Sequence, residues 1–451
     1  MPEKRSSFTG KIGFVLAAAG SAVGLGNIWR FPYLAAKYGG GIFLLVYLIL
    51  AVTFGFALMC AEIAIGRKTG KSAISAFAVL NKKYAFIGVL GAVIPAIILP
   101  YYSVIGGWVS KYFTVFITGE GALSATDGYF GDFISKPIEP IFWFLFFIGL
   151  TSIIVLFGVE KGIEKVSKVM MPVLVLLTLF IAIYSAFLPG ALDGVLYYIT
   201  PNFNDFSATT VLAAMGQLFY SMSLAMGIMI TYGSYIKKDI RLETSVRQIE
   251  TFDTLIAFLA GLMIIPAVFA FSGGDETALG KGPGLMFETL PKVFDAMKGG
   301  QIIGALFFLL VFFAALTSSI SLMETVVSIF MDKFGWGRKT SCLIVFLFSI
   351  MLGIPSSLGF GVWSKINIGG LSILDMFDFL SNSVLMPIVA LMTCIFVGYI
   401  IKPKSIIEEM EIGGKFNSKK LFTVIIKYIG PIFIVLILIS SILDAAGIVK
   451  I

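Results

Sequence analysis

Residues 20–32 are Gly20-Ser21-Ala22-Val23-Gly24-Leu25-Gly26-Asn27-Ile28-Trp29-Arg30-Phe31-Pro32, in the middle of the first apolar segment of the chain. A membrane helix should be continuous there, yet the three glycines, with Ala22 between them, weaken helix formation. Irregular backbone at membrane depth occurs only where it is buried in protein or lines a cavity. An unwound stretch frees carbonyls to bind a cation and amides to bind an anion, and half-helix ends add partial charges of matching sign. Asn27 and Arg30 favour this interpretation over a glycine-rich helix-packing surface, which stays open as the alternative.

The composition is that of a membrane protein with many spans. The chain has 451 residues, of which 58% are hydrophobic and 13% charged, and its mean hydropathy is +0.98. A charged fraction near 25% is typical of soluble proteins. Most apolar runs reach the roughly 20 residues that a membrane helix needs. The first run lacks a small-residue cleavage site and carries polar residues, so we do not interpret it as a signal peptide.

The apolar runs predict an all-α polytopic membrane protein with eleven transmembrane helices in a single domain, 1–451. The spans are expected near residues 11–35, 41–66, 85–117, 141–158, 168–188, 208–235, 249–273, 301–331, 341–355, 374–400 and 421–445. The longest loops on the outer side are expected at 119–138 and 274–300, and the second of these could fold back as a lid.

The distribution of basic residues predicts the orientation. Of the 33 Lys and Arg residues, 23 fall in the N-terminal segment and alternate loops, and six fall in the opposite loops. Basic residues concentrate on the cytoplasmic side of membrane proteins. We therefore expect a multi-pass protein of the cell membrane with a cytoplasmic N-terminus and, because the span count is odd, an external C-terminus. The net charge of +7 does not indicate a nucleic-acid surface.

Cysteine and histidine usage argues against several kinds of chemistry. The three cysteines, Cys60, Cys342 and Cys394, lie in apolar segments, and the chain has no histidine. A disulfide framework, a thiolate or histidine metal site and His-based catalysis are therefore not expected. With no catalytic residues to propose, an intramembrane enzyme is disfavoured. A passive channel is a further alternative, which turnover without substrate would reveal.

A second polar break, Gln217-Leu218-Phe219-Tyr220-Ser221-Met222-Ser223-Leu224-Ala225-Met226-Gly227, interrupts the sixth expected span. It stands five spans after the first, and because five is odd the second set of five must enter the membrane from the opposite side. Matching broken segments in inverted halves indicate a binding site near the midplane. We predict a first repeat over 11–188, a second, inverted repeat over 208–400 and an extra helix over 421–445. Ser and Thr also occur in ordinary membrane helices, so the pairing is the stronger signal.

The eighth span contains a third polar cluster, Ala314-Ala315-Leu316-Thr317-Ser318-Ser319. Hydroxyl, carbonyl, amide and carboxylate oxygens suit a hard cation such as Na⁺, and this cluster supplies hydroxyls. Successive residues turn around a helix, so the three hydroxyls cannot all face one neighbour.

Charged residues inside apolar segments need partners, since each costs about 2.5–3.5 kcal/mol at a helix centre. They are Arg30, Glu62, Asp253, Glu324 and Asp378. We interpret Arg30 with Asp378 as an outer gate, and Arg5 with Asp332 as an inner gate. The alternative is that these are static pairs that tether helices.

Together, the two breaks and Thr317-Ser318-Ser319 resemble the neurotransmitter:sodium symporter family, in particular its bacterial amino-acid transporters. The resemblance runs from Arg5 to the end of the eleventh span, and the twelfth span of some members is missing. It implies sodium-coupled symport of a small molecule by alternating access. It also implies Tyr235 close to the inner gate, and a weaker inner latch at Phe8, where the family usually has Trp.

The resemblance implies two sodium sites. The first comprises the Ala22 carbonyl, Asn27, Ser221 and the substrate carboxylate, with Asp253 where relatives usually have Asn. The second comprises the carbonyls of Gly20, Val23 and Ala314 with the hydroxyls of Thr317 and Ser318. Because a fixed negative charge at Asp253 could compensate sodium, we predict chloride independence.

The resemblance also implies that the substrate lies between the two breaks. Its carboxylate would meet the Leu25 and Gly26 amides and the Tyr102 hydroxyl, and its ammonium the carbonyls of Ala22, Tyr220 and Ser221, with Ser223 nearby. The walls would be Ile98, Tyr220, Met226, Ser318, Ser319 and Leu322, apolar and moderately roomy. Gly24 stands where monoamine transporters carry an acid, which favours an amino acid, and adaptable Met226 favours a large apolar or aromatic one. A small neutral solute, such as a glycine-like osmolyte, is the alternative.

Overall fold

The computed structural model describes residues 7–273 and 283–445, and Arg5 and part of the expected lid lie outside these ranges. The regular elements of the described residues are all helices, with two isolated β-bridges and no strand among them. This confirms the all-α class that composition predicts.

The elements follow in chain order, with η for π-helical or 3₁₀ segments. Those of the first half are α1 (Lys11–Ala22), η1 (Gly26–Arg30), α2 (Phe31–Lys37), α3 (Gly41–Leu50), η2 (Ala51–Gly55), α4 (Phe56–Thr69), α5 (Ala73–Leu80), η3 (Lys82–Tyr84), α6 (Ala85–Ile117), α7 (Gly121–Ser124), α8 (Tyr129–Ser135), α9 (Glu139–Leu156), η4 (Val159–Glu164), α10 (Lys165–Ala186), α11 (Leu192–Ile199) and η5 (Phe203–Asp205). Those of the second half are α12 (Ala208–Ser221), α13 (Ile228–Gly233), α14 (Leu242–Ser272), η7 (Leu285–Thr289), α15 (Leu290–Ala296), α16 (Gly300–Phe334), α17 (Arg338–Leu358), α18 (Ile373–Asp378), η8 (Phe379–Leu385), α19 (Met386–Ile395), η9 (Phe396–Ile400), α20 (Lys402–Met410), α21 (Lys419–Val424), η10 (Ile425–Ile429) and α22 (Gly430–Ala445).

Nine helices of the described part are long and apolar enough to cross a membrane, or ten when one bent pair counts as a single span. The bent pair is Lys11–Ala22 with Gly26–Lys37, the first expected span. The expected span at 208–235 is not among the ten, because α12 ends at Ser221 and α13 begins only at Ile228. The helices found therefore number fewer than the eleven spans predicted, and the difference is this interrupted segment.

The first break lies where the glycines predict it. Helix α1 ends at Ala22, Val23 has an extended backbone, and the two parts of the segment are bent by 54°. In the second break, Ser223 and Ala225 have positive φ angles of 53° and 63°. This backbone region is unfavourable for residues other than glycine, so the surrounding structure must hold the segment in this form.

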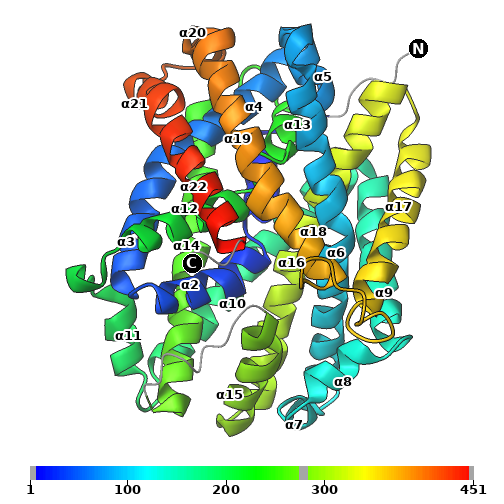
Figure 1. The fold of residues 1–451 in the computed structure, drawn as a ribbon, viewed down its shortest axis with the longest axis vertical. Coiled ribbons are helices and arrows are strands. Elements are labelled where there is room, and N and C mark those ends of the chain that lie inside the picture. The colour runs from blue at the N-terminus through cyan, green and yellow to red at the C-terminus, as the bar shows by residue number, and fades with distance from the viewer. Residues whose placement is uncertain (1–6, 274–282, 446–451) are drawn as a thin grey trace.

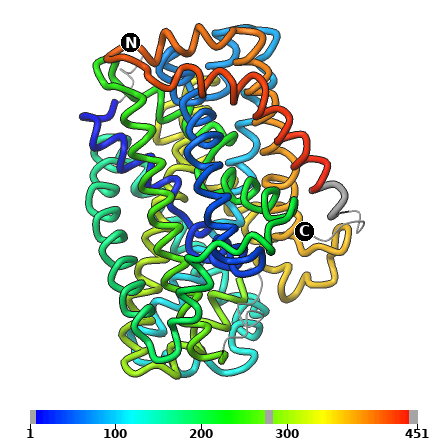
Figure 2. The backbone as a smooth tube through the Cα atoms, turned by 90° about the vertical axis from the view of Figure 1, so that its left-hand side faces the viewer, coloured from blue at the N-terminus to red at the C-terminus, as the bar shows by residue number. Residues whose placement is uncertain are grey.

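The long helices run between two ends of the molecule in both views (Figure 1, Figure 2). One end carries α20 and α21, and the other carries α7, α8, α11 and α15 (Figure 1). Helices α6 and α16 pack along each other, and α1 packs against α10, α14 and α16. This packing surrounds the first break with protein, as irregular backbone at membrane depth requires.

Candidate functional site

A small cavity of about 30 Å³ lies where the two breaks meet. It is lined by Ser21, Ala22, Gly24, Leu25, Gly26, Asn27, Ile98, Tyr102, Tyr220, Ser221, Ser223, Met226, Ile228, Ser318 and Leu322. The expected substrate residues are in this lining except Ser319, whose hydroxyl lies 3.0 Å from that of Thr151 on α9. The structure therefore brings together residues from four separate parts of the chain.

A fully buried polar cluster lies beside this cavity, at the expected first sodium site. The Asn27 amide group donates to the Ser221 hydroxyl at 3.0 Å and to the Asp253 carboxylate at 2.8 Å. Its side-chain oxygen accepts from the Gly24 amide at 3.1 Å. The Ser221 hydroxyl also donates to Asp253, at 2.8 Å. These contacts tie both breaks to α14 and supply the oxygen types that a hard cation prefers.

Tyr47 completes this cluster and was missed in the sequence analysis. Its hydroxyl is 3.2 Å from the Ser221 hydroxyl and donates to the other Asp253 oxygen at 3.1 Å. The signal available in the sequence was a single hydroxyl in the otherwise apolar run of α3. Such a group needs a partner once it is buried.

A second oxygen cluster lies around Ser318 on α16. Its hydroxyl is 3.4 Å from the Gly20 carbonyl oxygen, 3.1 Å from that of Ser21 and 3.3 Å from that of Val23. The Thr317 hydroxyl donates within its own helix to the carbonyls of Phe313 and Ala314, at 2.9 and 3.2 Å. The Ser318 hydroxyl therefore lies among carbonyls at the end of α1, whereas the Thr317 hydroxyl bonds within its own helix. The second sodium site stays a prediction.

The glycines of the first break are required by close approach. A Cβ atom at Gly24 would lie 2.7 Å from the Ser318 hydroxyl, and one at Gly26 would lie 2.5 Å from the Tyr220 ring. The Leu25 amide donates to the Tyr102 hydroxyl at 3.4 Å. The backbone of this stretch therefore faces the cavity at the place where the substrate carboxylate is expected.

Tyr220 separates the central cavity from an outer cavity of about 430 Å³, since it lines both. The Arg30 guanidinium lies over its ring, 5.2 Å from the centroid. The expectation of a moderately roomy pocket is not met in this conformation, because Tyr220 packs against Gly26 and little space remains beneath it. A bulky side chain can enter only if these walls separate.

The expected outer gate is not closed by an ion pair. Among the described residues, no salt bridge within 4.0 Å joins Arg30 and Asp378, although both line the outer cavity. Asp378 instead accepts from the Tyr101 hydroxyl at 3.1 Å and from the Asn382 amide at 2.6 Å. Arg30 and Asp378 therefore both line the outer cavity, and the Asp378 carboxylate is hydrogen-bonded by uncharged donors.

The opposite end of the site is tightly closed. Phe8 is fully buried, its ring packs on Phe14, Tyr232 and Tyr235, and its amide donates to the Tyr235 carbonyl at 3.1 Å. This position is therefore well packed in the structure, and the weaker latch that the resemblance implies stays a prediction. Asp332 accepts from the Ser72 amide at 2.7 Å; its expected partner Arg5 lies outside the described residues.

Tyr235 contacts an acid of α16. Its hydroxyl donates to Glu324 at 2.7 Å, and Arg338 donates to both oxygens of the same carboxylate at 2.8 Å. Paired hydrogen bonds of this kind are the strong form of an ion pair. Glu324 is thereby satisfied by a partner from α17 that the sequence analysis did not name.

Glu62 on α4 supports the second break. One of its oxygens accepts from the Ala225 amide at 2.7 Å, and the other has no hydrogen-bond partner in the described part of the chain. Because Ala225 has a left-handed backbone, this bond compensates part of the cost of holding the segment open.

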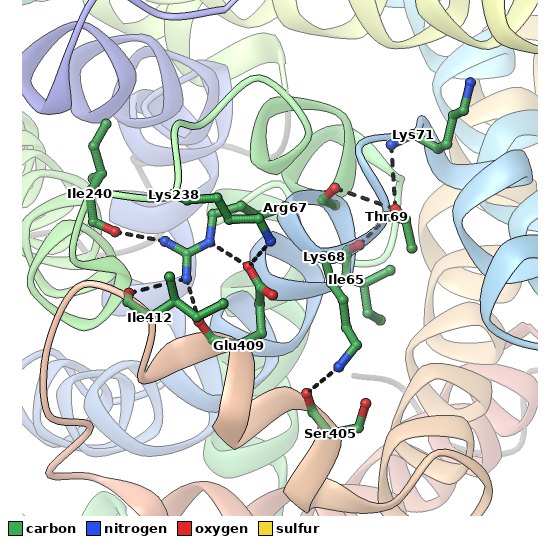
Figure 3. A network of polar contacts seen from close by, with 11 residues as sticks. Ile65, Arg67, Lys68, Thr69, Lys71, Lys238, Ile240, Ser405, Glu409 and Ile412 are labelled. Carbon is green, nitrogen blue, oxygen red and sulfur yellow. Dashed lines mark hydrogen bonds and ion pairs between the residues drawn. The ribbon is translucent and has the colours of Figure 1, made fainter.

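A polar network ties the ends of several helices together near α20 (Figure 3). Arg67 of α4 donates to the Glu409 side chain at 2.7 Å, to the Ile240 carbonyl at 2.7 Å, and to the carbonyls of Glu409 and Ile412. Lys238 adds a second cation at 2.7 Å from the Glu409 carboxylate. The network joins α4, the connection between α13 and α14, and α20.

Comparisons with known proteins agree with this geometry. The model of a family described as the sodium:neurotransmitter symporter family matches residues 5–127 and 134–449. The uncharacterized sodium-dependent transporter YhdH of Bacillus subtilis (strain 168) is 35% identical over 456 residues, 98% of each chain. An uncharacterized sodium-dependent transporter of Haemophilus influenzae is 32% identical over 455 residues, 97% of this chain and 98% of its own.

A solved structure is similar over nearly the whole chain. The crystal structure of MhsT in complex with L-phenylalanine has a TM-score of 0.88 and 39% sequence identity, and the match covers 97% of this chain and 100% of that one.

Proposed function

The chain belongs to the sodium:neurotransmitter symporter family, and from this premise we propose that it takes up an amino acid with a large apolar or aromatic side chain together with two sodium ions. That it is a sodium-coupled transporter and not an enzyme follows from the family and its relatives. The observation that supports this substrate and these ions is that both breaks line one small cavity. A backbone amide, that of Leu25, and the Tyr102 hydroxyl lie on one side of it.

Four features support an amino acid as the substrate. The Leu25 amide and the Tyr102 hydroxyl offer donors for a carboxylate, and position 24 has no side chain to bind an amine. Apolar walls at Ile98 and Met226 suit an apolar side chain. The similar structure of MhsT holds L-phenylalanine.

We place the first sodium ion among the Ala22 carbonyl, Asn27, Ser221 and Asp253, and the second among Gly20, Val23, Ala314, Thr317 and Ser318. In the structure Asn27 and Ser221 hydrogen-bond to Asp253 directly, so the ion would replace some of these bonds with coordination. Two charges crossing 100 mV supply about 4.6 kcal/mol. At about 1.4 kcal/mol per tenfold, this supports accumulation over about three decades.

The proposed mechanism is alternating access. The inner end is closed by the Phe8 latch, and the outer cavity lies above Tyr220. Binding would draw the broken helices together, and the bundle that contains them would rock against the remaining helices. The proposal includes eleven spans, with α12 and α13 as the broken sixth, in inverted repeats at 11–188 and 208–400. It places the α20 end in the cytoplasm, since Lys68, Arg67 and Lys238 lie there and basic residues favour that side.

The test is scintillation proximity binding on the purified protein, with labelled phenylalanine, leucine and glycine, each in Na⁺ and in K⁺. We expect phenylalanine and leucine to bind in Na⁺ only. Equal binding in both salts would contradict the sodium sites. Binding of glycine in preference to phenylalanine would favour the second candidate, a carrier of a small neutral solute, for which the cavity of about 30 Å³ is the observation.

We further propose that uptake is independent of chloride, because Asp253 already supplies a buried negative charge at the first cluster. Asp253→Asn keeps the shape of the side chain and removes that charge. We expect the Na⁺ affinity of this variant to fall by roughly tenfold or more in gluconate, about 1.4 kcal/mol, and to recover at least partly in chloride. Uptake measured in both anions is the readout. Wild-type uptake that required chloride would contradict the role given to Asp253. So would a variant whose Na⁺ affinity was the same in gluconate and in chloride.

A further inference from the structure

A surface hollow of about 720 Å³ lies away from the central site, between the ends of α10 and α14 and the residues that follow α15. Its walls include Phe180, Ile183 and Phe187 from the α10 side, Phe271 from α14, and Met297. Nothing in the transport mechanism above uses this space. Its lining includes Ala296, the last residue of α15, and the two residues that follow, and α15 lies at one end of the molecule (Figure 1).

The α10 wall is an exposed apolar stripe. Phe180 and Ile183 are each 51% exposed and Phe187 is 85% exposed. Their spacing of three and four residues puts them on one side of the helix end, along about 10 Å of its length. Large apolar side chains are exposed in this way where a membrane surrounds the protein. A hollow between such side chains can hold a flexible acyl chain, which a flat surface cannot.

The rim of the hollow is polar. Tyr184 lines it and donates to the Lys298 carbonyl at 2.8 Å, which fixes the backbone of Lys298 against α10. No carboxylate lies within 4.0 Å of the Lys298 ammonium among the described residues. Lys292, a few residues earlier, is paired with Asp127 at 2.5 Å. Within residues 7–273 and 283–445, Lys298 is therefore a cation without an acidic partner, in the lining of an apolar space and beside a tyrosine of the kind found at membrane interfaces.

We propose that this hollow binds one glycerophospholipid with an anionic headgroup, with an acyl chain along the α10 stripe and its phosphate on Lys298. Charge complementarity selects this occupant over a neutral lipid, and the length of the stripe suits part of one chain. The inference rests on the proposed placement of the long helices in a bilayer. Bound there, the lipid links α10 and α14 to the segment after α15.

The test uses the full-length purified protein after delipidation, titrated with phosphatidylglycerol or diacylglycerol and examined by native mass spectrometry. Lys298→Gln should weaken phosphatidylglycerol binding at the tightest site by at least fivefold, and Ile183→Trp, which fills the hollow, should remove that site. The matched controls are Lys292→Gln, a lysine already paired with Asp127, and Leu347→Trp, at a 54% exposed position of α17. Both should leave the binding within twofold of wild type.

Three results would overturn the proposal. Phosphatidylglycerol binding unchanged in both hollow variants would place the lipid elsewhere. Diacylglycerol binding as tight as phosphatidylglycerol would remove the role of the phosphate. Disulfide-linked dimers through Ile183→Cys in membranes would show a second copy of the chain as the occupant. Sodium-dependent substrate binding measured on the same samples separates failure of this proposal from failure of the transport proposal, because lipid retention needs no transport.

Discussion

Replacing Asn27 with alanine is expected to lower sodium-dependent uptake by at least a hundredfold, about 2.8 kcal/mol at 1.4 kcal/mol per tenfold. The Asn27 side chain makes four hydrogen bonds, to the Gly24 amide, the Ser221 hydroxyl, and the carboxylate and carbonyl of Asp253. It is fully buried. Alanine removes a proposed sodium ligand and also leaves the buried Asp253 carboxylate without its amide donor, which costs more than the lost bond alone.

The variant must be shown to be folded for this result to bear on the ion site. We therefore pair uptake with thermal stability measured in Na⁺ and in K⁺. Wild type should be stabilised by Na⁺, since a ligand that binds the folded state raises its stability, and the variant should be folded in K⁺ but gain little on adding Na⁺. Asn81→Ala is the control, because Asn81 caps the short η3 segment at the surface. Sodium stabilisation of the Asn27 variant equal to that of wild type would contradict the assignment.

Replacing Arg67 with methionine is expected to lower the free energy of unfolding by about 3–5 kcal/mol, the range for breaking a buried ion pair from one side. Arg67 and Glu409 side chains are 0% and 4% exposed, and Arg67 also satisfies three backbone carbonyls (Figure 3). Methionine fills much of the same space but donates nothing. The measurement is reversible unfolding in mixed micelles with increasing SDS.

A double-mutant cycle separates the charge from the packing. The double variant Arg67→Met with Glu409→Met removes both charges. It should therefore lower the free energy of unfolding by at least 1 kcal/mol less than the sum of the two single changes. Lys238→Met, at a 55% exposed lysine that contacts the same carboxylate, should cost no more than about 1 kcal/mol. If the effects of the two single changes on the free energy of unfolding simply added, the ion pair would not contribute to the stability of the fold.

Local signals made much of the fold predictable. Gly24 and Gly26 weaken a helix wherever they occur. The polar run that begins at Gln217 indicates the second break only approximately, because Gln217 and Ser221 still belong to α12 and the irregular backbone follows at Ser223 and Ala225. The all-helical class followed in the same way from composition. The number of spans was less predictable. The gap between α12 and α13 divides the sixth segment into two helices that do not form one continuous span.

The candidate site was predictable as far as its motifs are local. Residues of the two breaks and of α16 carry distinctive patterns, and the structure places them around one cavity. The direction of a single side chain was not predictable. Ser318 faces the carbonyls of α1, whereas Ser319, one residue further, turns to Thr151 of α9, because successive helical residues point about 100° apart.

The sequence by itself determined the helical class, the two breaks, the charge asymmetry and the family. Only the tertiary structure decided which partner each buried charge has: Tyr47 for Asp253, Arg338 for Glu324, and Arg67 for Glu409 across 342 residues of chain. It also decided that Tyr220 leaves a central space of only about 30 Å³. The physical reason is that helix breaks arise from propensities within a few residues, whereas ion pairs and cavity volumes depend on how helices distant in the chain pack together.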